Sequence, residues 1–351
     1  MRACSVAAFS GPALLGRSLS PAAVASSAAC GAFLRGVALS PKPLHAATAA
    51  AARRLTSSHP TSRAPVTMAD GGGGGSAAAP PTDNKMAHVV YRVVDMEATK
   101  KFYCEGLGMK VVRSRTNKDE GYANVFFGYG PERHCEYFSI ETTLNFGRTE
   151  PYNIGTGFGH IGLAFPDIKP VVEAVRACGV GSVTREVGPV KGGTSIIAFV
   201  RDPDGYMFEL IQRPARDPIA QVMLRVGDLD KAIAFYTDGL GMKLLRKRDV
   251  PDYKYTLGFV GYGPEEDSTV IELTYNYGVE SYELGDGYGQ VAIACEDIYK
   301  AADAVKAVGG TIAREPGPVP GIGTRISAVR DSTGWKTVLV DEGDLDKEFD
   351  V

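Results

Sequence analysis

Short stretches of alternating apolar and polar residues follow one another from residue 88 onward, and they are interrupted by segments with helical spacing. His88–Val94 alternates and predicts a strand. Asp95 then has the position of a helix N-cap, and apolar residues recur at helical spacing as far as Glu105. Glycines at 106 and 108 predict the end of that helix. Three strand-like runs follow, at 109–115, 122–129 and 136–143.

The same order of elements returns three more times. A strand at 158–165 precedes a helix over 167–178, and strands follow at 182–186, 195–200 and 206–211. Two further units start near Gln221 and Tyr288. GLGMK at 106–110 returns at 239–243, and GYGPE at 128–132 returns at 261–265, both after 133 positions. We therefore predict four βαβββ modules, arranged as two copies of a two-module unit.

Composition limits the kinds of partner. The chain has 351 residues, a formal net charge of −3 and 44% hydrophobic residues. This balance does not favour nucleic acid, and no apolar run approaches the roughly 20 residues of a membrane helix. The six cysteines are scattered without a CxxC pair, so we expect neither a zinc knuckle nor a disulfide framework.

The two ends of the chain differ from the repeats. Residues 1–69 hold seven Lys or Arg and no acid, which is typical of an organellar transit peptide, with the plastid favoured over the mitochondrion. A disordered low-complexity tail is the alternative. We expect a linker at 70–86, a first domain at 87–213, a second at 219–342, and a solvated acidic tail at 343–351.

Single polar residues stand in the middle of several predicted strands. Gln221 and Arg225 share one strand face, and Glu272 lies opposite its apolar neighbours. The same alternation applies to His160 and Glu209. Charged groups among apolar residues are costly unless they are paired or bind an ion, so we expect these side chains to gather on the concave side of a curved sheet.

Four motifs give the chain a specific resemblance. LRVGDL at 224–229, VIELTYNYG at 270–278, GHIGLAF at 159–165 and DPDGYMFEL at 202–210 are similar to motifs of the bacterial-type glyoxalase I enzymes of the vicinal-oxygen-chelate superfamily. The resemblance covers about residues 88–340. It implies an α+β fold in which the four modules pair into two half-barrel domains.

The resemblance also implies one divalent metal ion per site, held by two residues from each of two paired modules. Pairing of modules two and three gives the ligands His160, Glu209, Gln221 and Glu272. Pairing of modules one and four gives His88, Glu141, Gln290 and Val338. Because valine has no ligand atom, we expect one active and one degenerate site. If modules paired within each copy, the active set would be His88, Glu141, His160 and Glu209.

The reaction implied is isomerisation of the methylglyoxal–glutathione hemithioacetal to S-lactoylglutathione, with glutathione as cosubstrate. Glu209 is the expected base and Glu272 the second catalytic carboxylate. Nitrogen and oxygen ligands suit nickel, cobalt, zinc or manganese. The resemblance to the bacterial-type enzymes implies nickel or cobalt before zinc. The residues expected to hold glutathione are Arg225, Asn276, Arg185 and Lys191, with Arg92 and Asn145 as counterparts in the degenerate pair.

Two other functions fit the same scaffold. An extradiol dioxygenase would use two His and one Glu around iron, and the glutamine and second glutamate argue against it. A non-catalytic member that sequesters small molecules would need no metal ligands. Because tandem copies supply the contacts that a homodimer gains by association, we expect a monomer.

Overall fold

The computed structural model describes residues 83–190, 193–319 and 323–350. The expected transit peptide, residues 70–82 of the expected linker, and Lys191 lie outside these ranges. None of the helices in the described ranges has both the length and the apolar character needed to cross a membrane.

The predicted βαβββ order is confirmed in all four modules. Module one contains β1 (Lys85–Val93), α1 (Met96–Lys101), the π-helical turn η1 (Phe102–Gly106), β2 (Lys110–Asn117), β3 (Tyr122–Gly128), the short turn η2 (Arg133–Cys135) and β4 (Ser139–Asn145). Module two contains β5 (Phe158–Phe165), α2 (Lys169–Cys178), β6 (Ser182–Pro189), β7 (Ile196–Arg201) and β8 (Met207–Gln212).

Modules three and four follow the same plan. Module three contains β9 (Ile219–Arg225), α3 (Leu229–Ala234), the π-helical turn η3 (Phe235–Gly239), β10 (Lys243–Val250), η4 (Pro251–Tyr253), β11 (Tyr255–Gly261) and β12 (Val270–Asn276). Module four contains β13 (Tyr288–Cys295), α4 (Ile298–Ala307), β14 (Thr311–Pro318), β15 (Arg325–Arg330) and β16 (Lys336–Asp341). The chain continues with α5 (Glu342–Lys347) and η5 (Glu348–Asp350).

Aspartate side chains cap three of the helices, and the cap at Asp95 was expected from the sequence. Asp95 accepts a hydrogen bond from the backbone N–H of Ala98, and Asp228 accepts one from that of Lys231. Asp297 does the same for α4. The first helix is shorter than expected, because α1 gives way after Lys101 to a π-helical turn that buries two aromatic rings, Phe102 and Tyr103.

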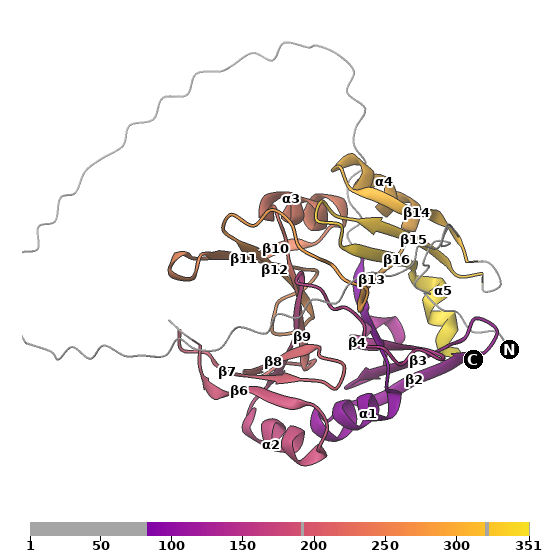
Figure 1. The fold of residues 1–351 in the computed structure, drawn as a ribbon. Helices are drawn as coiled ribbons and strands as arrows, with labels where there is room; N and C mark the ends of the chain where they lie inside the picture. Colours follow the sequence, from indigo (N-terminus) through magenta and orange to yellow (C-terminus); the bar gives the residue numbers. More distant parts are fainter. Residues whose placement is uncertain (1–82, 191–192, 320–322, 351) are drawn as a thin grey trace, which may run out of the picture. The chain divides into compact units, whose positions relative to one another are not determined.

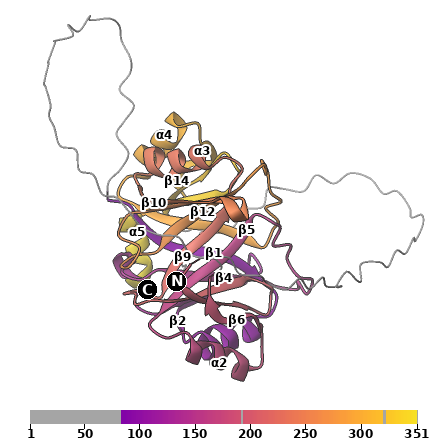
Figure 2. The same ribbon diagram turned by 90° about the vertical axis from the view of Figure 1, so that its left-hand side faces the viewer.

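Strand pairing joins modules from different copies. One eight-stranded sheet has the order β14-β15-β16-β13-β1-β4-β3-β2, and so combines modules four and one. The other has the order β10-β11-β12-β9-β5-β8-β7-β6, and so combines modules three and two. In each sheet the two modules meet through antiparallel first strands, β1 with β13 and β5 with β9. Figures 1 and 2 show these central strands.

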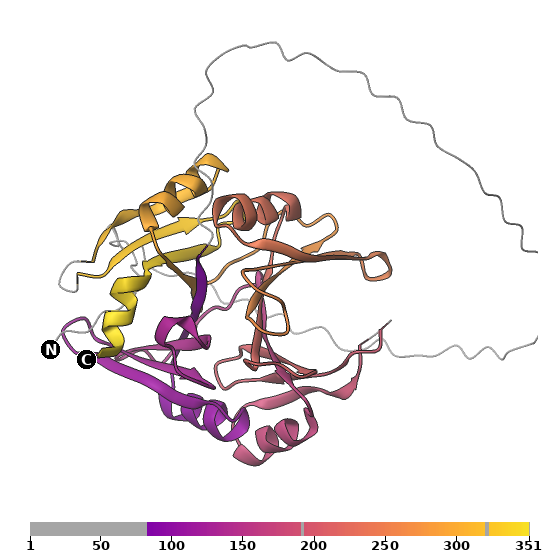
Figure 3. The same ribbon diagram turned by 180° about the vertical axis from the view of Figure 1, so that it is seen from behind.

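Helices, in contrast, pack within a copy. Figures 1 and 3 show the helices of modules one and two together at one end, and those of modules three and four at the other. Gly106 of η1 lies against Val175 of α2, and a side chain there would meet it at 3.3 Å. Gly239 of η3 lies against Val308, just after α4, at 3.0 Å. Because each sheet contains one module from each copy, these helix contacts within the copies hold the two sheets together.

The C-terminal segment is not the solvated tail expected for residues 343–351. Residues 342–347 form α5, which buries Leu345 to 2% exposure. Glu348 lies 3.2 Å from Arg113 and 3.6 Å from Arg115 of β2, so its carboxylate is paired. The expectation was wrong because the acidic residues have cationic partners elsewhere in the chain. Arg113, for example, lies 235 positions before Glu348, and the local sequence does not show this pairing.

Candidate metal centre and its surroundings

Strand register brings four polar side chains onto one face of the sheet of modules two and three. Across the β5–β9 pair, His160 lies opposite Met223 and Gly162 lies opposite Gln221. β8 runs parallel to β5 and brings Glu209 beside Gly162, while β12 runs parallel to β9 and brings Glu272 beside Met223. The alternate positions of these strands, such as Ile161, Val222 and Leu273, point their apolar side chains to the other face.

The polar atoms of the four side chains lie close enough to bind one metal ion together. Gln221 Nε2 is 2.5 Å from Glu272 Oε2 and 3.3 Å from Glu209 Oε2. His160 Nε2 is 3.2 Å from Glu209 Oε2 and 3.8 Å from Glu272 Oε2. One ligand atom from each of His160, Glu209 and Glu272 lies within 4.8 Å of the other two. Gln221 Nε2 is 3.4 Å from His160 Nε2, so the amide belongs to the same cluster.

Electrostatics in the cluster favour an added cation. Burial and the negative charge of Glu209 raise the pKa of Glu272 to about 7, although His160 and Arg246 act in the opposite direction. Burial alone would lower the pKa of His160, but the hydrogen bond and negative charge of Glu209, together with Glu272, raise it. Two crowded carboxylates with neutral nitrogen and oxygen donors form a set that fits a divalent metal ion.

The corresponding cluster in the other sheet is altered. His88 Nε2 lies 3.3 Å from Glu141 Oε2, and Gln290 is fully buried nearby. Glu141 Oε1 accepts a hydrogen bond of 2.6 Å from Asn124, a contact that leucine cannot make at the equivalent position 257. Val338 packs in an apolar cluster with neighbours that include Ala292, Ala328, Val340 and, from α5, Leu345.

The sheet pairing separates the ligand set that pairing within copies would require. His88 and Glu141 lie in the sheet of modules one and four, whereas His160 and Glu209 lie in the sheet of modules two and three. The other donor cluster found among the described residues consists of His134, Glu342 and Asp346. There His134 Nδ1 contacts Asp346 at 2.6 Å and Lys85 contacts Glu342 at 2.5 Å, so these groups already have partners.

The residues expected to hold glutathione lie at two places around the cluster. Arg225 Nη1 donates to the backbone carbonyls of Thr156 and Phe158, at 3.0 and 2.9 Å. Asn276 Nδ2 donates to the hydroxyl of Tyr282 at 2.9 Å. Arg185 of β6 lies opposite Phe199, whose ring contacts that of His160 edge-on.

The counterparts in the other sheet keep this pattern. Arg92 Nη1 donates to the carbonyl of Asp286 at 2.6 Å, and Asn145 Nδ2 donates to the hydroxyl of Tyr152 at 2.6 Å. Both copies therefore preserve an arginine, an asparagine and a tyrosine near the loops that connect the two sheets.

Sequence reasoning missed two residues beside the cluster. Arg246 stacks on Phe259, with its guanidinium carbon 3.7 Å from the ring centroid, and pairs with Glu265 at 2.8 Å. Its charge partly offsets the rise in the pKa of Glu272. Gly162 leaves the room that Gln221 occupies. Comparison of the two copies could have pointed to both residues. Arg246 is repeated as Arg113, 133 positions earlier, whereas Gly162 is replaced by alanine in the other copy.

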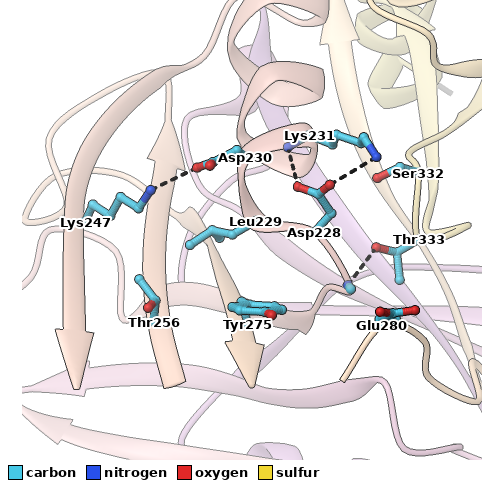
Figure 4. A pocket seen from close by; sticks show the side chains of 11 residues that line it. Asp228, Leu229, Asp230, Lys231, Lys247, Thr256, Tyr275, Glu280, Ser332 and Thr333 are labelled. Atoms are coloured by element: carbon cyan, nitrogen blue, oxygen red, sulfur yellow. Dashed lines mark hydrogen bonds and ion pairs between the residues drawn. The ribbon is translucent and has the colours of Figure 1, made fainter. Parts of the chain in front are cut away.

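A cavity of about 640 Å³ lies on the opposite face of the same sheet, at the start of α3. Figure 4 shows Lys247 paired with Asp230 and Lys231 paired with Asp228 in this cavity. Tyr275 lines it, and this side chain alternates with Glu272 and Thr274 along β12. The cavity is therefore separated from the four-residue cluster by the sheet itself.

Comparisons with known proteins agree with this geometry. A sequence profile of the Glyoxalase/Bleomycin resistance protein/Dioxygenase superfamily matches residues 85–210 and 218–339. The chain is 56% identical to "Probable lactoylglutathione lyase, chloroplastic" of Arabidopsis thaliana, over 76% of this chain and 75% of that protein. It is 54% identical to "Lactoylglutathione lyase" of Oryza sativa subsp. japonica, over 76% and 92% of the two chains. The crystal structure of glyoxalase I from Zea mays superposes with a TM-score of 0.73 at 54% identity, covering 76% of this chain and 95% of that one.

Proposed function

Because this chain belongs to the glyoxalase/bleomycin resistance protein/dioxygenase superfamily, we propose that it is a lactoylglutathione lyase. It isomerises the hemithioacetal of methylglyoxal and glutathione to S-lactoylglutathione. Relatives that are 54–56% identical over 76% of the chain carry that name. The structural observation that supports the proposal is the cluster of one imidazole, one amide and two carboxylates between modules two and three.

His160, Glu209, Gln221 and Glu272 would hold one divalent metal ion. When bound, such an ion would polarise the two vicinal oxygens of the hemithioacetal and stabilise the negative charge that develops on them. The donor set contains no thiolate, which suits nickel, cobalt, zinc or manganese. The resemblance to the bacterial-type enzymes favours nickel or cobalt among them.

Proton transfer is assigned to the two carboxylates. Glu209 is the more accessible of the two, with 15% of its side chain exposed against 8% for Glu272. It can therefore approach the carbon-bound proton of the substrate and act as the base. Glu272 is buried beside Arg246 and would return the proton, or serve the other enantiomer of the hemithioacetal.

Glutathione carries carboxylates that require cationic and amide partners. Arg225 and Asn276 would bind its γ-glutamyl end, and Arg185 with Lys191 its glycyl carboxylate. Arg225 is prepositioned by its two bonds to backbone carbonyls. This reduces the side-chain entropy that would be lost when substrate binds.

The barrel of modules one and four is assigned no catalytic role. Val338 supplies no ligand atom, and Asn124 holds the carboxylate of Glu141. One active site in a single chain that contains both paired sheets agrees with a monomer. The name of the Arabidopsis relative includes "chloroplastic", which supports the plastid as the location of this protein too.

The dioxygenase alternative has less support. Extradiol-type iron sites use two histidines and one carboxylate. Among the described residues, this cluster has one histidine, two glutamates and a glutamine.

Substitution of Glu209 tests the proposed function directly. Glu209→Gln is expected to lower turnover of the hemithioacetal by at least about 100-fold, because removal of a positioned base costs 10² to 10⁴. Glu141→Gln is the matched control in the other barrel and is expected to retain activity. Circular dichroism of both variants shows whether they fold. A folded Glu209→Gln protein with near-normal turnover would refute the assignment.

Metal content tests the number of sites. Metal analysis of the reconstituted protein is expected to give one ion per chain. Val338→Glu restores a carboxylate beside His88, Glu141 and Gln290, and is expected to raise this number to two. Val338→Met is the control for the added volume, because its side chain brings neither a carboxylate nor an amide. Two ions in the unaltered protein would contradict the assignment of a degenerate site.

A further inference from the structure

The degenerate barrel has gained a cation where it has lost a carboxylate. The turn and strand DPDGYMFEL at 202–210 correspond to DSTGWKTVL at 331–339. Glu209 is thus replaced by Val338, and Met207 is replaced by Lys336, two positions earlier on the same strand face. The two changes together shift the local charge by two units in the positive direction.

Strand register places this lysine in a row with other polar side chains. Lys336 lies opposite Arg330 across the β15–β16 pair. On the other side of β16 runs β13, which is parallel to it and pairs Val291 with Thr337. One residue back along both strands, Gln290 is therefore next to Lys336. Val90 lies opposite Gln290, and Arg92 follows two residues later on the same face of β1. The row therefore carries three cations, and Gln290 lies within it.

No described acidic group compensates Lys336. The charges that act on it are those of Arg92 and Arg330, and both are positive. Burial, followed by these two guanidiniums, lowers the pKa of Lys336 to about 8. Arg92 and Arg330 each donate to a backbone carbonyl, of Asp286 and Gly334 respectively, so neither charge is neutralised by these contacts. Partly buried cations of this kind are stabilised when an anion binds between them.

The C-terminal segment packs on a different part of the sheet from the cationic row. Leu345 and Phe349 pack with Val338, Val340 and Ala294, on the part of the sheet beyond Val338. Lys336 lies on the other side of Val338 along β16, toward Asn145 at the end of β4 and Tyr152 in the loop that follows. The apolar cluster and the cationic row are thus at different positions along the same strands.

We propose that Arg92, Arg330 and Lys336, with Asn145 and Gln290, form a metal-independent binding site for a carboxylate-bearing γ-glutamyl peptide of the glutathione type. The ligand class follows from the preserved arginine, asparagine and tyrosine, which match Arg225, Asn276 and Tyr282 of the active barrel. In this respect the inference rests on the proposed function. An anionic ligand is favoured by the three cations, because no described acidic group acts on Lys336.

Calorimetric titration of the full-length, chelator-treated protein with S-methylglutathione tests the site, since this probe cannot form a hemithioacetal through its sulfur. Arg225→Ala is used as the background because it weakens binding in the active barrel. We expect one remaining site per chain in that background. Lys336→Met is then expected to weaken it at least about tenfold, and Lys336→Arg to retain it.

Lys336→Met restores the residue that the first copy has at 207, so folding is expected to be preserved. Lys231→Met is the matched control, because Lys231 is exposed and pairs with Asp228. In the Arg225→Ala background, equal affinity with and without Lys336→Met would overturn the proposal. Absence of binding in the Arg225→Ala protein itself would overturn it too. Sodium sulfate at the same concentration serves as a second probe. Displacement of S-methylglutathione by it would overturn the peptide assignment and indicate a general anion site.

The proposed activity is read out separately. Turnover is measured on the metal-loaded protein and depends on Glu209, whereas this site is titrated without metal. Retention of Lys336-dependent binding in a Glu209→Gln protein that has lost turnover is the expected result. Binding that disappears together with turnover would contradict a separate site.

Discussion

Gly162 lies directly opposite Gln221 on neighbouring strands, and the absence of a side chain at Gly162 gives Gln221 its place in the cluster. A methyl group at 162 would be 2.2 Å from Cγ and 2.8 Å from Cδ of Gln221. In the other sheet the equivalent pair is Ala292 and His88. At this strand junction the two barrels thus differ by a methyl group and by the exchange of Gln221 for His88, in addition to the change at Val338.

Gly162→Ala is expected to move the amide of Gln221 out of the cluster. The contact of 2.2 Å is far below van der Waals distance, and the side chain of Gln221 is the group that can give way. We expect a loss of metal affinity and a fall in turnover of at least about tenfold, measured by metal analysis and steady-state kinetics. Ala292→Gly is the control and is expected to leave turnover unaltered. Native metal content in Gly162→Ala would show that Gln221 is not a ligand.

Arg225→Ala is expected to act mainly on substrate binding. The guanidinium is held by two backbone carbonyls and lies on the face of Gln221, so its loss removes a positioned cation without changing the carboxylates. We expect KM for the hemithioacetal to rise at least about tenfold with a smaller change in kcat. Arg216→Ala, at an exposed arginine paired with Glu136, is the control. A fall in kcat at constant KM would assign Arg225 to the chemical step instead.

Alternation of side chains along each strand was sufficient to predict which residues share the concave face. It predicts that His160, Glu209, Gln221 and Glu272 lie on such faces. Which of these faces meet is a different question, because it depends on antiparallel pairing of β5 with β9 and of β1 with β13. The sequence left two pairings open, and the resemblance to a known family was needed to favour one.

Alternation along the strands does not predict a residue whose role is to leave space for a neighbour, or one whose partners are distant in the sequence. The role of Gly162 follows from the register between two strands, and a glycine in a strand has several explanations. The docking of α5 follows from Arg113 and Arg115, which lie far from Glu348 in sequence. Acidic residues at a chain end are typical of a solvated tail, and only their partners in the fold distinguish the two cases.

Leu345→Ala is expected to destabilise the protein through the barrel of modules one and four. Leu345 is 2% exposed and packs with an apolar cluster that includes Val338 and Val340. Truncation of a buried leucine costs about 2–5 kcal/mol, and we expect a value in this range from urea unfolding. Lys347→Ala in the same helix, at a side chain that is 74% exposed, is expected to change stability by about 0.5 kcal/mol or less. Equal stability of the two variants would mean that α5 is not docked in solution.

Asp202 is expected to make the folded state less stable as the pH rises from about 4 to about 7. Burial, followed by the negative charge of Asp204, raises the pKa of Asp202 to about 7, although it accepts hydrogen bonds from the backbone N–H of Tyr206 and the hydroxyl of Tyr103. The unfolded chain ionises near its ordinary value of 3.8. Between these two pH values the folded state binds more protons, so increasing pH favours unfolding.

Asp202→Asn removes this titration and keeps a group of the same shape. The free energy of unfolding of the variant, relative to the natural chain, is therefore expected to rise between pH 4 and pH 7 by up to about 4 kcal/mol. Asp217 and Asp331, whose pKa values are each raised to about 6 mainly by burial, remain in both proteins and cancel in the difference. Urea unfolding at a series of pH values measures it. A difference that stays constant with pH, or falls, would show that Asp202 is ionised in the folded protein throughout this range.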